Sequence, residues 1–203
     1  RQRQMCIRDR NKGFKLNPKE YNIGTIVHSV YKYFTTLAKQ RGIKFEVEVP
    51  EEELLASVDK EALTKILSNL FANALKYART YVYLHLSVDE KNEVFTISMS
   101  NDGNIVPIEM RENIFKAFVQ YRDGKDIVSG TGIGLAMARY LAELHQGMLV
   151  MDRELDCNRF ILSIPILHQT LPDDSEEQHK KPGYDDEDRE VSDKEKREVA
   201  SCL

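Results

Sequence analysis

Two neighbouring stretches of the chain alternate apolar and polar residues with the period of a β-strand, and this alternation constrains the fold most strongly. In Tyr81–Val88 the residues Val82, Leu84, Leu86 and Val88 fall on one face. Val94–Ser100 follows with a second strand pattern. A sheet with one apolar face must bury that face against another layer of secondary structure. The sequence therefore predicts a sheet covered on one side.

Helical patterns flank these strands and supply the covering layer. Further strands are predicted as well, so that helices alternate with adjacent pairs of strands. This order predicts a two-layer α/β sandwich, with one mixed sheet covered by helices on one face. The predicted elements are a helix from Tyr21 to Gln40 that ends near Gly42, strands at Ile43–Val49 and Leu54–Val58, a helix capped by Asp59 and carried by Ala62–Ala78, a helix from about Gly132 to Gln146, and a closing hairpin of Met148–Arg153 with Arg159–Ile164.

The periodic part of the chain is bounded by two patternless ends. Residues 1–13 are read as an N-terminal fragment edge or linker, and residues 14–167 as one domain. Residues 168–203 are read as an acidic disordered tail or interdomain linker, because Pro172–Ala200 holds 12 acidic and 6 basic residues and few large apolar ones. The chain begins with Arg1, so we expect a fragment of a longer protein.

Composition excludes several classes of protein. No apolar run reaches the ~18 residues that a membrane span needs. Three cysteines without metal-ligand spacing form no disulfide framework and suit a reducing compartment. A pI near 5.8 argues against a nucleic-acid binder that relies on a broad basic face.

Polar residues form a second stripe on the helix around Ile66–Ala78. Leu63, Ile66, Leu67, Leu70 and Ala74 make the apolar stripe, and Asn69, Asn73 and Lys76 lie together away from it. Asparagine is a poor helix former, so two on one stripe indicate a use. An amide oxygen is a hard ligand for magnesium, and an ammonium group attracts phosphate. A solvated polar stripe is the alternative.

Glycines cluster in front of the next predicted helix. Five of the ten glycines fall between Gly103 and Gly134, and Gly130, Gly132 and Gly134 directly precede the apolar helix. Free backbone N–H groups at a helix N-terminus form an anion site suited to phosphates. The spacing fits neither a dinucleotide-binding fingerprint nor a Walker A loop. A flexible turn is the alternative reading.

A polar turn, Ser100–Pro107, leaves the second long strand. A side-chain acceptor beside Gly103 could meet a purine amino group there. Taken alone, these residues are better explained by an ordinary Asn-Asp-Gly turn.

In their order along the chain, these boxes resemble the catalytic and ATP-binding domain of two-component sensor histidine kinases, which has the Bergerat fold of the wider ATPase group. The resemblance covers about Phe14–Leu167. It rests on an asparagine box at Asn69–Tyr77, a phenylalanine box at Ile114–Phe118, a second glycine box at Gly130–Leu135, and the closing Ala142–Gly147.

The resemblance implies a role for each box. Asn73 is implied as the magnesium ligand, and Asn69 lies where related ATPases place a glutamate general base, which suggests suppressed hydrolysis and favours transfer to a protein. The residues implied to bind or border ATP are Asn73, Lys76, Tyr77, Asn101, Asp102, Gly103, Phe115, Phe118, Arg122, Gly130, Thr131, Gly132, Ile133, Gly134 and Leu135, with Asn69, Asn73 and Lys76 as the catalytic group. A lid is expected over about Val119–Ser129, where Arg122 or Lys125 could reach the γ-phosphate.

Two departures concern the first glycine box. The family has an aspartate that accepts the adenine amino hydrogens, and Asn101 stands at that position with Asp102 next to it. An asparagine carbonyl can still accept this bond, without charge assistance. Ile105 replaces the second glycine.

The implied activity is transfer of the γ-phosphoryl group of ATP, with Mg²⁺, to a histidine on a separate dimerisation domain. None of His28, His85, His145, His168 and His179 precedes an acidic residue, so all five are read as structural or incidental and the acceptor is expected upstream of Arg1.

Two partners are expected from this activity: the separate domain that carries the phosphoacceptor histidine, and a receiver domain, possibly downstream in the same chain. No nucleic-acid partner is expected, and the full-length protein is expected to be a homodimer. A cytoplasmic domain of a parent anchored in the bacterial inner membrane is expected. The alternatives are a degenerate ATP-binding signalling module and a serine kinase of the anti-sigma type.

Overall fold

The computed structural model describes residues 15–120, 131–152 and 157–166. Twelve elements follow one another in this part of the chain. They are β1 (Lys19–Asn22), α1 (Ile23–Gln40), β2 (Lys44–Glu48), β3 (Leu55–Val58), α2 (Lys60–Tyr77), β4 (Tyr81–Asp89), β5 (Val94–Asn101), the 3₁₀ turns η1 (Ile108–Met110) and η2 (Asn113–Phe115), α3 (Gly134–Leu144), β6 (Met148–Met151) and β7 (Asn158–Pro165).

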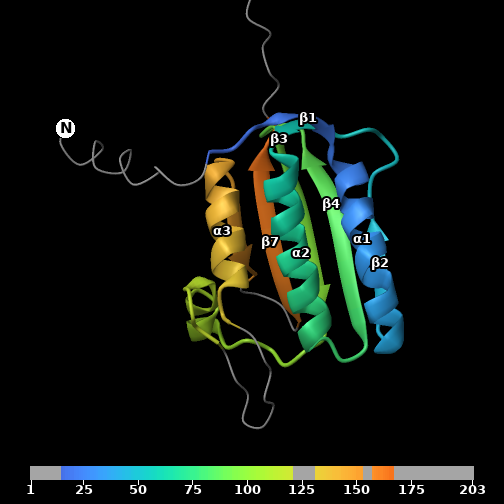
Figure 1. The fold of residues 1–203 in the computed structure, drawn as a ribbon, viewed down its shortest axis with the longest axis vertical. Helices are drawn as coiled ribbons and strands as arrows, with labels where there is room; N and C mark the ends of the chain where they lie inside the picture. The colour runs from blue at the N-terminus through green and yellow to red at the C-terminus, as the bar shows by residue number, and fades with distance from the viewer. Residues whose placement is uncertain (1–14, 121–130, 153–156, 167–203) are drawn as a thin grey trace, which may run out of the picture. The chain divides into compact units, whose positions relative to one another are not determined.

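A five-stranded mixed sheet forms one layer of the fold. Its strand order is β2-β4-β5-β7-β6, with β2 parallel to β4 and the other neighbours antiparallel. The helices α1, α2 and α3 lie together in front of the sheet in Figure 1. The predicted two-layer α/β sandwich with helices on one face is confirmed.

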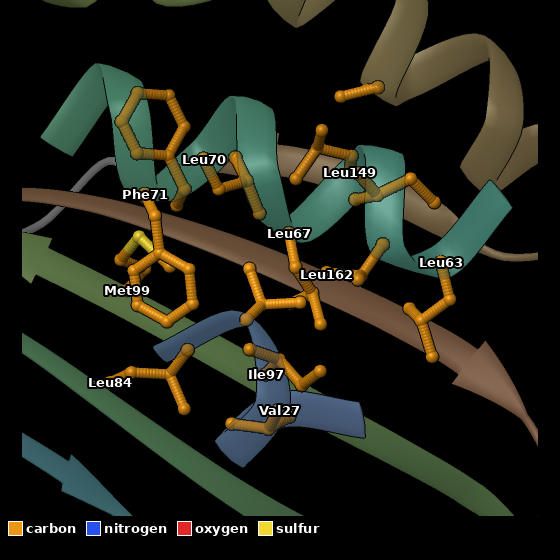
Figure 2. Packing of buried hydrophobic residues seen from close by; sticks show 14 of the residues in the cluster. Val27, Leu63, Leu67, Leu70, Phe71, Leu84, Ile97, Met99, Leu149 and Leu162 are labelled. Carbon is orange, nitrogen blue, oxygen red and sulfur yellow. The ribbon is translucent and has the colours of Figure 1, made fainter. Parts of the chain in front are cut away.

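Helix α2 is the centre of the core because its apolar stripe faces the sheet. The five predicted stripe residues are all 0% exposed. Figure 2 shows Leu63, Leu67 and Phe71 of α2 pointing toward Leu162 and Met99 on the strands below. Burial of such side chains supplies the main favourable term for folding.

Asp59 caps α2, as the sequence predicts. Its extended backbone (φ -79°, ψ 108°) places the carboxylate to accept a hydrogen bond from the N–H of Ala62 at 3.0 Å. Burial acts to raise the pKa of Asp59, but hydrogen bonds from the N–H groups of Asn17 and Ala62 outweigh it and hold the pKa below its usual value. The charged cap therefore also ties the segment before β1 to the start of α2.

Three details differ from the sequence prediction. The short strand β1 pairs with β3 in a separate two-stranded sheet, and four residues with the pattern KEYN carry no period that predicts this. Val88 is 37% exposed although it lies on the predicted apolar face, one residue before the end of β4. Helix α3 begins at Gly134, since Gly132 has φ +69°, which is outside the helical region.

None of the described helices combines the length and the apolar character that would be needed to cross a membrane.

Candidate functional site

The polar stripe of α2 lies half-buried along one side of the helix, beside its apolar stripe. Asn69, Asn73 and Lys76 all have intermediate exposure. Asn69 donates its Nδ2 to the carbonyl of Lys65 in the preceding turn, at 2.9 Å. In the described part of the chain the amide of Asn73 makes no hydrogen bond, so its oxygen is available to a ligand.

The aromatic ring that ends α2 lies beside this stripe. The Nζ of Lys76 is 5.0 Å from the ring centroid of Tyr77, and Tyr77 is 36% exposed. The sequence places these two residues at the nucleotide, and the structure brings them together at one end of the stripe.

The start of α3 meets the middle of the stripe. A Cβ added at Gly134 would stand 2.7 Å from the Oδ1 of Asn69, so a larger residue at this position would have to displace the Asn69 side chain. The N-cap residue Ile133 supplies no side-chain hydrogen bond to the first turn of α3. The first N–H groups of the helix therefore lack a side-chain acceptor within the described residues, which leaves a helix N-terminus suited to an anion beside Asn69.

A pair of left-handed residues shapes the approach to α3. Gly132 (φ +69°) accepts a hydrogen bond at its carbonyl from the N–H of Phe118, at 2.9 Å, and Phe118 has φ +67°. A Cβ on Gly132 would stand 2.9 Å from the Phe118 carbonyl carbon. The phenylalanine box and the second glycine box are thus in direct backbone contact, on the two sides of residues 121–130.

Three predicted site residues, Arg122, Lys125 and Gly130, lie outside the described residues, as does most of the predicted lid. Thr131, Ile133 and Leu135 lie inside them and flank the two described glycines of the box.

The loop after β5 lies against the end of α2. A Cβ on Gly103 would stand 2.3 Å from the carbonyl oxygen of Tyr77, so the glycine is required for this close approach. Asn101 is 2% exposed, and its Oδ1 accepts a hydrogen bond from the N–H of Gly103 at 3.0 Å. Asn101 is predicted to accept a hydrogen bond from adenine, but its carbonyl oxygen already accepts one from the backbone of the protein itself.

Asp102, which is predicted to lie at the nucleotide, is hydrogen-bonded to the protein backbone. Its carboxylate accepts hydrogen bonds from the N–H groups of Arg79 and Thr80 at 2.9–3.0 Å and of Tyr81 at 3.2 Å, and from the Thr80 hydroxyl. Partial burial acts to raise its pKa, but these hydrogen bonds outweigh burial and lower the pKa to about 2. The carboxylate therefore holds the start of β4.

Phe115, which is also predicted to border the nucleotide, is a buried residue. It is 5% exposed and packs edge-on against Phe160, with ring centroids 6.2 Å apart, while the guanidinium of Arg139 lies 3.8 Å from its ring centroid. Phe115 therefore anchors the phenylalanine box in the core. Phe118 is instead 76% exposed.

Two buried residues that sequence analysis missed hold the loop after β5. Asn158 (3% exposed) accepts a hydrogen bond from the N–H of Val106 at 3.0 Å and donates to the carbonyl of Asn104 at 2.8 Å. Arg111 (6% exposed) donates to the carbonyls of Val106 and Asp152. No local pattern marks either residue, because the partners of Asn158 are more than fifty residues away.

One hollow in the described part of the chain is lined by none of the predicted site residues. A shallow hollow of about 510 Å³ lies on the side of the sheet facing away from the helices, with Tyr81, Tyr83 and Arg159 in its wall. In the described ranges no three His, Cys, Asp or Glu residues gather to hold a metal ion. A single amide ligand such as Asn73, completed by phosphate oxygens and water, remains suited to magnesium.

The histidines within the described ranges occupy different settings. His145 accepts a hydrogen bond at Nε2 from the N–H of Asp59 at 3.1 Å, and its Nδ1 lies 2.7 Å from the carbonyl of Leu141. His28 is exposed and His85 lies on β4. His168 and His179 lie outside the described residues.

The chain is similar in sequence to curated histidine kinases. Hybrid signal transduction histidine kinase D of Dictyostelium discoideum is 27% identical over 159 residues, which are 74% of this chain and 10% of that protein. Sensor histidine kinase WalK of Bacillus subtilis is 29% identical over 119 residues, 57% of this chain and 20% of that protein. The chain thus spans a small part of these relatives.

Solved structures have the same fold. Full-length ShkA in complex with AMPPNP has a TM-score of 0.66 and 25% identity, over 75% of this chain and 32% of that one. The nucleotide-free catalytic domain of histidine kinase ThkA has a TM-score of 0.65 and 24% identity, over 74% of this chain and 97% of that one.

Residues 58–168, more than half of the chain, match the family of histidine kinase-, DNA gyrase B- and HSP90-like ATPases. This range includes the stripe of α2, the loop after β5 and the start of α3. The chain belongs to this ATPase family, as an ATP-binding catalytic domain of the histidine-kinase type.

Proposed function

We propose that the chain binds Mg²⁺-ATP between α2, the loop after β5 and the start of α3, and transfers the γ-phosphoryl group to a histidine on a separate domain. The observation that carries this proposal is the contact of Gly134 with Asn69, which places a helix N-terminus beside the amide stripe of α2. Phosphoryl transfer is catalysed mainly by positioning and by stabilising charge, and these elements supply both.

Asn73 is the proposed magnesium ligand. Its amide is half-buried and without a hydrogen bond among the described residues, whereas Asn69 is held by the carbonyl of Lys65. A bound magnesium ion would neutralise charge on the phosphates. Asn69 is a neutral amide that cannot remove a proton from water, so hydrolysis is expected to be slow relative to transfer.

The phosphates are assigned to the second glycine box and the first turn of α3. Gly132 and Gly134 have no side chain there, and Thr131, Ile133 and Leu135 lie beside them in the chain. Gly130 and Arg122 belong to the same proposal on the basis of sequence alone. Lys76 and Tyr77 are assigned to the border of the nucleotide, and the segment around Asn101 and Gly103 to the base.

An exposed apolar surface beside the phosphate site suits a helical partner. Ile133, Met137 and Tyr140 lie on one face of α3 with exposures of 38%, 44% and 38%, next to the exposed Phe118. Apolar side chains gathered on one face favour protein contact. We assign this surface to the phosphoacceptor domain of a homodimeric parent protein. A receiver domain, a cytoplasmic location and a membrane-anchored bacterial parent remain expectations of the resemblance.

A second function is a signalling module that binds nucleotide without transfer. The engaged carbonyl of Asn101 favours it, because a weakened base site lowers affinity. A serine kinase of the anti-sigma type is the remaining alternative, and the acceptor residue distinguishes it.

The test supplies a histidine-bearing helical hairpin from a sensor kinase in trans with γ-labelled ATP and Mg²⁺. Acid-labile label on the hairpin histidine is the expected result. Label on serine would favour the anti-sigma alternative, and nucleotide binding without label would favour the binding module. The chain alone should not label itself.

A further inference from the structure

Arg139 is a charged residue of α3 that lies largely within the protein. It stands five residues after Gly134, and its side chain is 18% exposed. A guanidinium group presents five N–H donors in a fixed plane, so it is stable away from water only where acceptors match that plane. Two segments outside α3 supply acceptors to Arg139.

The hydrogen bonds of Arg139 join α3 to these two segments. Its Nη1 and Nη2 donate to the two carboxylate oxygens of Glu112, with 3.2 Å between Nη2 and Oε2. Such a bidentate pair fixes the orientation of both side chains. Its Nε donates to the carbonyl of Leu149 at 3.0 Å. Leu149 lies on β6, at one end of the strand order, so this bond ties α3 to the edge of the sheet.

The same guanidinium group also lies over an aromatic ring. It is 3.8 Å from the ring centroid of Phe115, and a cation is attracted to the face of such a ring. Phe115 is 5% exposed and packs against Phe160, so it cannot move away without opening the core. Glu112 is the N-cap residue of η2 and Phe115 is its last residue. Arg139 therefore fixes both ends of η2 against α3.

Backbone hydrogen bonds connect η2 to the second glycine box. The N–H of Lys116 donates to the carbonyl of Asn113 at 2.9 Å, and the N–H of Phe118 donates to the carbonyl of Gly132 at 2.9 Å. Gly132 lies two residues before the start of α3. A closed ring of contacts thus runs from α3 through Arg139, η2 and Phe118 to Gly132, and from there back into α3.

We infer that Arg139 is a positioning residue for phosphoryl transfer, which fixes η2 against α3 and thereby holds Phe118 and Gly132 in place at the phosphates. This inference rests on the proposed function, which assigns the phosphates to Gly132 and the first turn of α3. The segment around Asn101 and Gly103, assigned to the base, receives none of the hydrogen bonds of Arg139 within the described residues. The rate of transfer should therefore depend on Arg139 more than the affinity for the nucleotide does.

Amide hydrogen exchange of the 203-residue chain, followed by NMR, tests the positioning step directly. In Arg139→Gln we expect the N–H of Phe118 to exchange about 10-fold faster than in the wild type, because its bond to Gly132 opens locally. The N–H of Leu67, in the buried centre of α2, should be accelerated by a much smaller factor. Equal acceleration of both amides would mean that Arg139 only adds to global stability, and would overturn the inference.

Steady-state transfer to a histidine hairpin supplied in trans tests the effect on the reaction. In Arg139→Gln we expect kcat to fall about 10- to 100-fold, since a misplacement of about 1 Å costs up to about 100-fold in rate. The KM for Mg²⁺-ATP should change less than about threefold. Arg139→Lys should recover part of kcat, because an ammonium group keeps the charge beside Glu112 without the bidentate pair.

Glu112→Gln keeps the test decisive if Arg139→Gln fails to fold. The side chain of Glu112 is 69% exposed, so its substitution leaves the core intact. It should lower kcat in the same direction by a smaller factor, because Arg139 keeps its contacts with Phe115 and Leu149.

Arg159→Gln is the matched control, because it removes the same charged group from another partly buried arginine. Arg159 donates from Nε to the Oγ of Ser100 at 3.1 Å, in the wall of the hollow on the other side of the sheet. Its kcat and KM should equal those of the wild type.

The outcomes separate this inference from the proposed function. If the wild type transfers phosphate and both Arg139→Gln and Glu112→Gln keep its kcat, the inference alone is overturned. A rise in KM with kcat unchanged would also overturn it. Absence of nucleotide binding and transfer in the wild type would overturn the proposed function and the inference with it.

Discussion

Gly134 and Asn69 are in contact across α3 and α2, with only 2.7 Å between a Cβ built on Gly134 and the Oδ1 of Asn69. The side chain of Asn69 is also held from the other end by its bond to the carbonyl of Lys65. This contact joins the asparagine box to the second glycine box, which the sequence separates by more than fifty residues.

Gly134→Ala should therefore be coupled to Asn69. The added methyl group must displace the Asn69 side chain, so we expect it to lower stability in the wild type and to be neutral or stabilising in Asn69→Ala, where a helical alanine is favoured over glycine. A coupling free energy of about 0.5–3 kcal/mol is expected from urea denaturation of the four chains. If the changes in the free energy of unfolding caused by the two substitutions were additive, the two residues would not be in steric contact.

Asn73→Ala should abolish magnesium-dependent nucleotide binding and leave the thermal midpoint nearly unchanged, because the side chain lies off the buried stripe. Asn73→Asp is the matched variant, since a carboxylate is also a magnesium ligand. It should retain part of the magnesium dependence in a titration by fluorescence or calorimetry. Wild-type transfer to a histidine hairpin by Asn73→Ala would refute the assignment.

Asp102→Asn should destabilise the fold by about 1–3 kcal/mol at neutral pH, because an NH₂ group would face backbone donors at the start of β4. In the folded wild-type protein the pKa of this carboxylate is lowered to about 2. Its contribution to the free energy of unfolding is therefore fully present above its ordinary pKa and is lost as the pH falls toward 2.

The stability difference between Asp102→Asn and the wild type should thus narrow between about pH 4 and about pH 2. Denaturant titrations across this range measure it. Asp89→Asn is the comparison: Asp89 accepts hydrogen bonds from Asn92 and Lys91 in an exposed turn, and these bonds also lower its pKa, so its stability difference should narrow in the same direction but by less than that of Asp102. A difference for Asp102 that does not change with pH would contradict the role assigned to its charge.

Deleting Pro172–Leu203 should leave the nucleotide affinity and the thermal midpoint nearly unchanged. The composition of this segment cannot support a core of its own, and every proposed ligand precedes it. Calorimetry on the full and shortened chains compares both quantities. A fall of many degrees in the midpoint would contradict the interpretation of the segment as a tail.

Period and capping were enough to predict the layers of this domain from the sequence. The alternation in Tyr81–Val88, the apolar stripe of α2 and the cap at Asp59 are local signals, because each depends on the regular geometry of one strand, one helix or one helix end. The order of the polar boxes likewise indicated the family. The separate pairing of β1 with β3, by contrast, had no local signal.

The identity of the groups that face a ligand depended on contacts between distant segments. The sequence placed Asn101, Asp102 and Phe115 in one site, but Asp102 binds the backbone at the start of β4, and Phe115 packs under Arg139. Asn158 entered the site because β7 pairs with β5 in a register that sets it opposite Asn101. A residue type limits the hydrogen bonds that a side chain can make, and tertiary packing decides which of them the protein satisfies itself and which remain for a ligand.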